Sequence, residues 1–282
     1  MKRIAIIGAD GMLGSAFVEN FTRTNVTHYA LTISDIDITN LNSFGVLAEI
    51  APDVIINCAA YTAVDLAENE PELAVAVNSE GVKNLAIFAT DYNCKLVHFS
   101  TDYVFSGKKE LYTELDETGP IGVYGNSKLQ GEQSIQNTLS ESQYLIIRTA
   151  WLYGPNGNNF VNTMLNIAKS KDEINVVGDQ FGAPTFTIDL VNWTLDLLKL
   201  NATGVYHGVN SGSCSWCEFA KKIFDLKDIK IKTHCVDTKS YPTLATRPKF
   251  SVLENKKLQS TLKYNIRNWA EALSEYLISI TI

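Results

Sequence analysis

Short apolar runs alternate with longer amphipathic segments through the first half of the chain. The run Ile4-Ala5-Ile6-Ile7 has no polar position, which is typical of a strand buried on both faces of a sheet. Comparable β-branched runs predict strands at 3–8, 27–32, 53–58, 95–100 and 144–148. Helical spacing between them predicts helices at 12–24, 41–50, 71–91 and 124–137. This order predicts an α/β fold with a doubly wound, parallel Rossmann-type sheet.

The regular alternation weakens after about residue 150. Loops rich in glycine, proline and asparagine occupy 154–159 and 178–185, and shorter elements follow. We therefore expect a dinucleotide-binding domain over residues 1–150 and a smaller C-terminal substrate-binding lobe over most of 151–282. A helical pattern at 188–200 could pack back onto the first domain.

Composition favours chemistry on a small molecule. The 282 residues are 45% hydrophobic and 20% charged, which is typical of a globular protein, and the formal charge is −7. That charge argues against nucleic acid or a membrane surface as a partner, because such binders normally present a basic face. No stretch approaches the roughly 20 apolar residues of a membrane span.

The cysteines predict reduced thiols. Their number is odd, they are scattered, and the short apolar run after Met-Lys-Arg is not a signal peptide, so we expect a cytoplasmic protein without a disulfide framework. A zinc half-site or redox pair at Cys214-Ser-Trp-Cys217 is disfavoured, because no second pair has suitable spacing. The five cysteines are Cys58, Cys94, Cys214, Cys217 and Cys235.

Three glycines follow the first strand at Gly8, Gly11 and Gly14 and open a helix. Such a turn lets the backbone approach a pyrophosphate, and the helix start supplies free N–H groups, so the pattern predicts dinucleotide binding. We expect Asp10, inside this turn, to cap the helix rather than to face phosphate.

The end of the second strand bears on cofactor choice. Thr32-Ile33-Ser34 offers neither the acidic residue that selects NAD nor a basic partner for a 2′-phosphate. NADPH is favoured here, and NADH stays open. Asp37 and Ile38 are placed to approach the adenine, and the small residues that end the third strand, at 57–62, leave room for the cofactor.

Tyr124 and Lys128 lie four residues apart on one predicted helix, so both face the same way. Thr101 ends the strand before this helix. We expect the ammonium of Lys128 to lower the pKa of the Tyr124 phenol toward the working pH, as in a hydride-transfer site.

These motifs and several later blocks resemble the dTDP-4-dehydrorhamnose reductase family, within the extended short-chain dehydrogenases/reductases. The resemblance covers the whole chain and includes Gly8–Gly14, Asn57–Asp65, Phe99–Phe105, Tyr124–Lys128, Arg148–Tyr153, Gly157–Phe160, Asp179–Thr185 and Arg247-Pro248. It implies reduction of the 4-keto group of dTDP-4-dehydro-β-L-rhamnose by NADPH or NADH. The product, dTDP-L-rhamnose, is a donor for surface polysaccharides.

The resemblance also implies roles for individual residues. Tyr124 protonates the C4 alkoxide, Lys128 lowers the pKa of Tyr124 and holds the nicotinamide ribose, and Thr101 hydrogen-bonds the ketone. The cofactor contacts it implies are Gly8, Gly11, Met12, Leu13, Gly14, Asp37, Ile38, Ala60, Tyr61, Thr62, Phe99, Tyr124 and Lys128. The substrate contacts it implies are Thr101, Asp102, Tyr124, Trp151, Gln180, Phe181 and Arg247.

The sequence departs from the family pattern at two positions. Gly122 replaces a frequent asparagine, and Ala16 stands where some relatives place a magnesium-binding glutamate at a dimer interface. We therefore expect no metal, and a homodimer stays open. Two other functions also stay open: an epimerase, dehydratase or reductase for a related nucleotide-linked 4-keto-deoxysugar, and a non-catalytic regulatory subunit. Asp102 is followed by Tyr103 rather than a second carboxylate, which disfavours a dehydratase.

Overall fold

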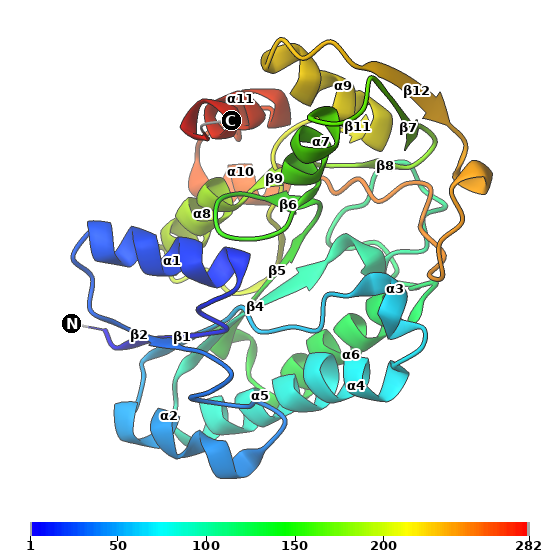
Figure 1. Ribbon diagram of the computed structural model, residues 1–282. Coiled ribbons are helices and arrows are strands. Elements are labelled where there is room, and N and C mark those ends of the chain that lie inside the picture. Colours follow the sequence, from blue (N-terminus) through cyan, green and yellow to red (C-terminus); the bar gives the residue numbers. More distant parts are fainter. Residues whose placement is uncertain (1, 281–282) are drawn as a thin grey trace.

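A six-stranded parallel sheet forms the centre of the computed structural model, in which residues 2–280 are described. The strand order is β10-β5-β4-β3-β1-β2, and every neighbouring pair is parallel (Figure 1). The predicted doubly wound α/β fold is confirmed. The strands are β1 (Ile4–Ile7), β2 (His28–Leu31), β3 (Val54–Asn57), β4 (Lys95–Thr101), β5 (Tyr144–Thr149) and β10 (Gly204–His207).

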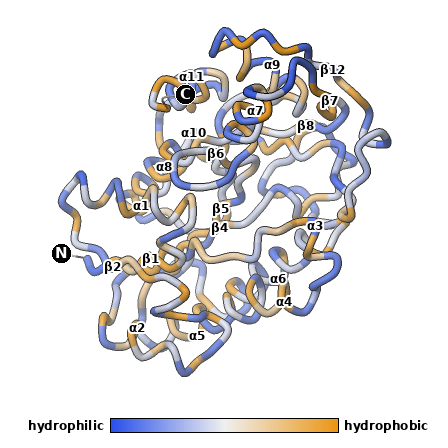
Figure 2. Tube along the Cα trace, viewed as in Figure 1, coloured by the Kyte–Doolittle hydropathy of each residue, from blue (hydrophilic) through white to orange (hydrophobic). Residues whose placement is uncertain are grey.

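Helices bury both faces of this sheet, as the continuous apolar strands require. In β1, Ile4 and Ile6 join one core cluster and Ala5 and Ile7 join the other. Figure 2 shows these strands as apolar stretches within the fold. The first cluster packs against α1 (Met12–Arg23), α8 (Thr187–Lys199) and α10 (Lys256–Leu262), and the second against α2 (Gly45–Ile50), α5 (Gly81–Asp91) and α6 (Val123–Thr138).

The helix predicted over 71–91 is a composite. It comprises α4 (Pro71–Val75), a π-helical turn at Ala76–Glu80 and α5. The π-helical turn contains Asn78, which is fully buried and bonds the backbone of Tyr61. A widened turn of this kind is frequently associated with functional sites. The short helix α3 (Val64–Ala67) precedes it.

Elements after residue 150 also contribute to the first domain. Helix α8 packs on α1 across one face, and β10 pairs with β5. The remaining elements form a second lobe with its own core cluster. They are β6 (Leu152–Tyr153), α7 (Phe160–Ala168), β7 (Glu173–Val177), β8 (Phe181–Gly182), β9 (Thr185–Phe186), β11 (Cys214–Ser215), α9 (Trp216–Leu226), β12 (Lys232–Val236) and α11 (Trp269–Ser279).

The prediction of five reduced thiols is wrong in this structure. Cys217 at the start of α9 and Cys235 on β12 form a disulfide, with Cα atoms 5.5 Å apart. Helix α9 packs against β12, so two cysteines 18 residues apart meet although their spacing matches no motif. Cys58, Cys94 and Cys214 are free thiols.

Candidate active site and adjoining cavity

The turn between β1 and α1 is a tight backbone cradle. Gly8 has a φ of +73°, and a Cβ added there would lie 2.8 Å from the Ala59 nitrogen. A Cβ at Gly14 would overlap the Gly8 carbonyl oxygen. At Gly11 a Cβ would meet only that oxygen, at 3.4 Å, so the turn is open on this side. The first N–H groups of α1 have no side-chain cap, which fits a pyrophosphate held by backbone donors.

Asp10 does not cap α1, contrary to the prediction. The N-cap is Gly11, which has extended backbone angles and no side-chain hydrogen bond to the helix. Asp10 lies one residue earlier and is exposed. Its carboxylate therefore leaves the N–H groups at the helix start free.

The residues after Gly11 link the cradle to the rest of the molecule. Leu13 is buried in the core against the sheet, while Met12 is half-buried. A Cβ added at Gly157 would lie 2.9 Å from Met12 Cβ, so the loop between β6 and α7 passes directly over the start of α1. The second lobe thus reaches the predicted cofactor turn.

The predicted adenine contacts follow β2. The Asp37 carboxylate accepts hydrogen bonds from the Thr39 nitrogen at 2.9 Å and from its hydroxyl at 2.8 Å, which fixes a local turn. Ile38 is buried, and a Cβ added at Gly81 would lie 2.6 Å from its side chain. Ile38 is therefore a core residue of this edge, and Asp37 shapes the loop beside it.

The segment after β3 is held by Asn78. Its amide accepts a hydrogen bond from the Tyr61 nitrogen at 2.9 Å and donates one to the Tyr61 oxygen at 3.0 Å. Ala60 is half-buried and Thr62 is exposed. This pairing fixes the backbone of the segment at the carboxyl edge of the sheet, where ligands bind in open α/β folds.

Thr101, Tyr124 and Lys128 meet at the carboxyl end of β4. The Thr101 hydroxyl accepts from the Tyr103 nitrogen at 3.2 Å and lies near enough to the Tyr124 phenol to lower its pKa. Lys128, one turn further along α6, donates to the Phe99 carbonyl oxygen at 2.6 Å. Helix α6 can approach so closely because Gly125 has no side chain; a Cβ there would overlap the Tyr103 carbonyl oxygen.

The predicted lowering of the Tyr124 pKa is not what this arrangement gives. Burial raises the pKa of Tyr124, the nearby Thr101 hydroxyl opposes that rise, and the nearby Asp102 adds to it. Burial also lowers the pKa of Lys128 to about 8, against the attraction of Glu132 and Cys58. The phenol is therefore protonated at neutral pH and can act as an acid.

Asp102 is a buried carboxyl with one oxygen free for a ligand. Its Oδ1 accepts from the Thr101 hydroxyl at 2.9 Å, while Oδ2 has no hydrogen-bond partner among the described residues. Burial raises the pKa of Asp102 to about 6, and the nearby hydroxyls of Ser251 and Thr101 oppose that rise. Such a group gains from a polar ligand.

A buried ion pair supports the catalytic helix from below. Arg148 of β5 donates to Glu132 of α6 from Nε at 3.0 Å and from Nη2 at 2.7 Å. Glu132 lies one turn beyond Lys128, so the pair fixes α6 against the sheet. Sequence analysis included Arg148 in a family block but did not single out either partner.

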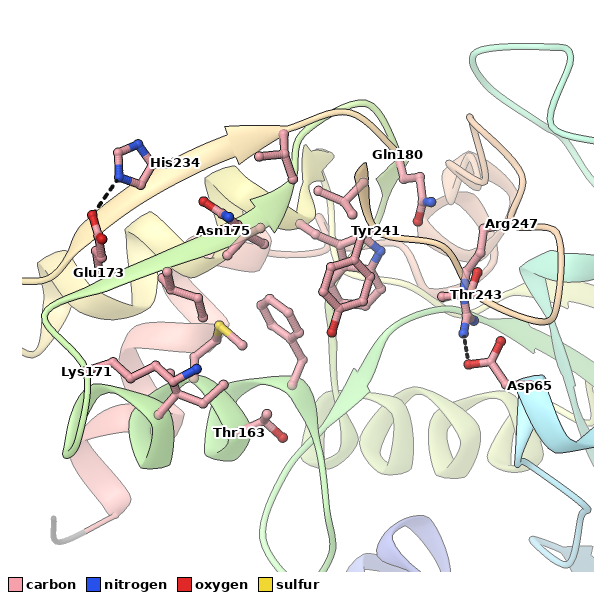
Figure 3. A pocket seen from close by; sticks show the side chains of 18 residues that line it. Asp65, Thr163, Lys171, Glu173, Asn175, Gln180, His234, Tyr241, Thr243 and Arg247 are labelled. Carbon is pink, nitrogen blue, oxygen red and sulfur yellow. Dashed lines mark hydrogen bonds and ion pairs between the residues drawn. The ribbon is translucent and has the colours of Figure 1, made fainter. Parts of the chain in front are cut away.

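A cavity of about 1060 Å³ lies between α7, the β7–β12 pair and the segment before β8 (Figure 3), and its lining does not include Thr101, Tyr124 or Lys128. Two predicted substrate residues line it, Gln180 and Arg247. Arg247 donates to Asp65 at 2.7 Å and to the Tyr103 hydroxyl at 3.3 Å. Since Tyr103 packs edge-on against Tyr124, Arg247 connects the cavity to the catalytic cluster.

Trp151 and Phe181 do not line this cavity. The Trp151 ring stacks on Trp216, with centroids 3.4 Å apart, and Trp216 lines the cavity. Trp151 also has a φ of +46°, a sparsely populated conformation for a large residue. Phe181 stacks on Phe250 at 5.5 Å. Trp151 therefore acts on the cavity wall through its neighbour.

Most of the cavity lining carries no recognisable sequence signal. Tyr241 and Thr243 come from an aperiodic loop, and Lys171 follows α7 without any motif. Figure 3 shows Tyr241 in the middle of the cavity and the Asp65–Arg247 ion pair at its edge. Asp65 lies in the block Asn57–Asp65, which was the one available signal.

Residues 2–280 contain neither a metal-binding cluster nor a membrane-spanning helix. No group of three or more His, Cys, Asp or Glu side chains there could hold a metal ion. Within the same range, no helix is long and apolar enough to cross a membrane.

Comparisons with known proteins agree on one family. The sequence model described as RmlD substrate binding domain matches residues 1–282. The dTDP-4-dehydrorhamnose reductase of Aggregatibacter actinomycetemcomitans is 39% identical over 97% of this chain and 97% of its own length. The dTDP-4-keto-6-deoxy-D-glucose reductase of Streptomyces niveus is 36% identical over 97% and 96%. The crystal structure of Bacillus anthracis dTDP-4-dehydrorhamnose reductase with NADP has a TM-score of 0.95 and 40% identity, covering 99% of both chains.

Proposed function

Because this chain belongs to the RmlD substrate binding domain family, we propose that it is an NADPH-dependent dTDP-4-dehydrorhamnose reductase. It reduces the 4-keto group of dTDP-4-dehydro-β-L-rhamnose to give dTDP-L-rhamnose for surface polysaccharide synthesis. The cluster of Thr101, Tyr124 and Lys128 carries this proposal, because a hydroxyl, an acid and an ammonium lie together beside the glycine cradle. The cradle fits the pyrophosphate of NADPH.

When bound, NADPH would supply a hydride to C4 of the sugar. As C4 accepts it, negative charge develops on the ketone oxygen, and the Thr101 hydroxyl stabilises that charge by turning its one proton from Asp102 Oδ1 to the ketone oxygen. Tyr124 then gives its phenolic proton to the same oxygen. Burial keeps this proton on the phenol until the more basic alkoxide forms. The ammonium of Lys128 stabilises the phenolate that remains.

The cavity is proposed to hold the nucleotide part of the substrate. Arg247 can bind a diphosphate through two parallel hydrogen bonds, and its ion pair with Asp65 pre-positions it at the cavity edge. Gln180 lines the cavity, and the free Oδ2 of Asp102 is available to a sugar hydroxyl. Trp151 and Phe181 are proposed to shape the walls from behind.

The direct test is NADPH oxidation with enzymatically prepared dTDP-4-dehydro-L-rhamnose, with the product identified by NMR. We expect dTDP-L-rhamnose, and slower turnover with NADH. A Lys128→Met variant is the control for non-enzymatic oxidation. Cofactor binding without turnover of this substrate would refute the assignment.

A related 4-keto-deoxysugar is the second candidate substrate, because the Streptomyces niveus relative is named for dTDP-4-keto-6-deoxy-D-glucose. Both substrates would share Thr101, Tyr124 and Lys128 and differ in stereochemistry near Asp102. Competition between the two sugars at equal concentration ranks them by kcat/KM.

The organisation of the molecule is also proposed. Residues 1–150 bind the dinucleotide, together with α8, β10 and α10, which complete the first domain. The rest of 151–282 forms the substrate lobe. We propose a cytoplasmic location, where NADPH is available, and a homodimer; cell fractionation and light scattering test these two points.

A further inference from the structure

His98 lies directly beneath the catalytic lysine. It is a β4 residue with no solvent exposure, between the Asn57 side chain of β3 and the Lys128 side chain of α6. Its Nδ1 is 3.1 Å from Asn57 Nδ2, and its Nε2 is 3.5 Å from Lys128 Nζ. His98 takes no direct part in the proposed hydride or proton transfer.

The hydrogen bonds of Asn57 fix the tautomer of His98. Asn57 Oδ1 accepts from the Ala59 nitrogen at 3.1 Å, so its NH₂ group faces the imidazole. An NH₂ group only donates, and His98 Nδ1 must therefore accept. Burial and the Lys128 charge hold the pKa of His98 well below its usual range, so the ring is neutral. Its single proton is then on Nε2.

The Nε2–H group points at the nitrogen of Lys128. An ammonium has only donors, so in that form Lys128 presents a donor to a donor. A neutral amine has a lone pair that can accept from Nε2–H while it still donates to the Phe99 carbonyl oxygen. The imidazole therefore favours the uncharged lysine.

We propose that His98 is a positioning residue. Asn57 keeps it as the Nε2–H tautomer, and in this form it makes the Lys128 ammonium more acidic. This inference rests on the proposed function, in which each turnover leaves a Tyr124 phenolate. One proton then passes from the Lys128 ammonium to Tyr124, and Lys128 takes up another from solvent. His98 makes the first transfer easier.

Other charged and titratable groups near Lys128 act in the opposite direction or are neutralised. Glu132 on α6 raises the pKa of Lys128 and is itself paired with Arg148 of β5, while burial raises the pKa of the Cys58 thiol after β3 and leaves it uncharged. Tyr124 on α6 is protonated and therefore uncharged. Only burial and the contact with His98 therefore favour the uncharged amine form of Lys128 among these groups.

Nitrogen-15 NMR of histidine-labelled protein tests the tautomer without any turnover. We expect His98 to remain the neutral Nε2–H form from about pH 6 to 9. His207 is an internal contrast, because its Nδ1 is 3.1 Å from the Glu254 carbonyl oxygen, which makes it the Nδ1–H form. His98→Gln assigns the signals; if it does not fold, His28→Gln, His207→Gln and His234→Gln assign them by elimination. An Nδ1–H form, or titration of His98 in this range, overturns the inference.

Kinetics test the consequence. The carboxylate of an Asn57→Asp variant can accept hydrogen bonds from both the Ala59 nitrogen and an Nδ1–H group, so it should reverse the tautomer of His98. In the pH profile of kcat/KM, the apparent pKa assigned to Lys128 should then rise by about one unit, a tenfold change in its acidity. The added charge alone also raises it, so the same substitution is made in a His98→Gln background. A smaller shift there supports the inference; equal shifts overturn it. If wild-type protein shows no turnover, the proposed function fails, whereas the NMR result still stands or falls separately.

Discussion

At the scale of single residues, Asp102 links stability to function. Its pKa in the folded protein is about 6, above the ordinary value of 3.8, because it is buried. A carboxyl with a raised pKa stabilises the fold below pH 3.8, and this contribution is lost as the pH rises through 6. At neutral pH the ionised Asp102 carboxylate therefore destabilises the fold. Such a cost is expected of a residue whose role is to bind a ligand.

We expect Asp102→Asn to stabilise the protein at pH 7.5 by about 2 to 3 kcal/mol and to leave stability at pH 4 nearly unchanged. The same variant should raise KM for the sugar nucleotide. Urea denaturation across this pH range measures the first effect. Asp116→Asn is the control with the opposite sign, because the Lys109 and Thr113 hydrogen bonds lower the pKa of Asp116 to about 2. A stability gain that does not depend on pH would contradict the argument.

Substitution of two neighbouring tyrosines, Tyr124 and Tyr103, distinguishes loss of the catalytic acid from loss of a structural contact. Tyr124→Phe removes the proposed acid and should lower kcat by roughly 10²- to 10⁴-fold, with NADPH affinity retained. Tyr103→Phe keeps the ring that packs against Tyr124 and loses only the hydrogen bond from Arg247, so its effect should fall mainly on KM. Steady-state kinetics of both variants check this. Similar losses of kcat in the two would remove the special role of Tyr124.

At the scale of elements, the contact between α6 and the β4 end depends on a missing side chain. A Cβ at Gly125 would overlap the Tyr103 carbonyl oxygen, so Gly125→Ala must displace the helix that carries Tyr124 and Lys128. Helix propensity alone would favour alanine by about 1 kcal/mol. We nevertheless expect lower thermal stability and a fall in kcat of at least about tenfold.

Gly45→Ala is the matched control for that prediction. Gly45 begins α2 with right-handed helical angles, and a Cβ there would meet nothing within 4 Å. Its substitution should be neutral or slightly stabilising, with activity unchanged. Thermal melting compares the two variants; a Gly125→Ala protein as stable and active as Gly45→Ala would show that the close contact is unimportant.

The sequence predicted the elements whose periodicity is strong and local. Five strands were predicted from apolar runs and the first turn from its glycines. Tyr124 and Lys128 were predicted to face the same way because they lie four residues apart on one helix. Strand β10 was missed because Gly204-Val-Tyr-His207 has no continuous apolar run and its partner β5 lies far away in sequence. The Glu132–Arg148 pair and the cavity lining were missed for the same reason, since only the tertiary fold brings those residues together.

At the scale of the whole molecule, the Cys217–Cys235 bond ties α9 to β12 in the substrate lobe. Closing a loop of 18 residues restricts the unfolded chain, which is worth about 3 kcal/mol in the chain-entropy account. Protein purified without reductant and then unfolded should therefore show three free thiols, and Cys235→Ser should melt at a lower temperature. Dithiothreitol should lower the melting temperature of the wild type but not of Cys235→Ser. Five reactive thiols in the unreduced protein would show instead that Cys217 and Cys235 remain reduced.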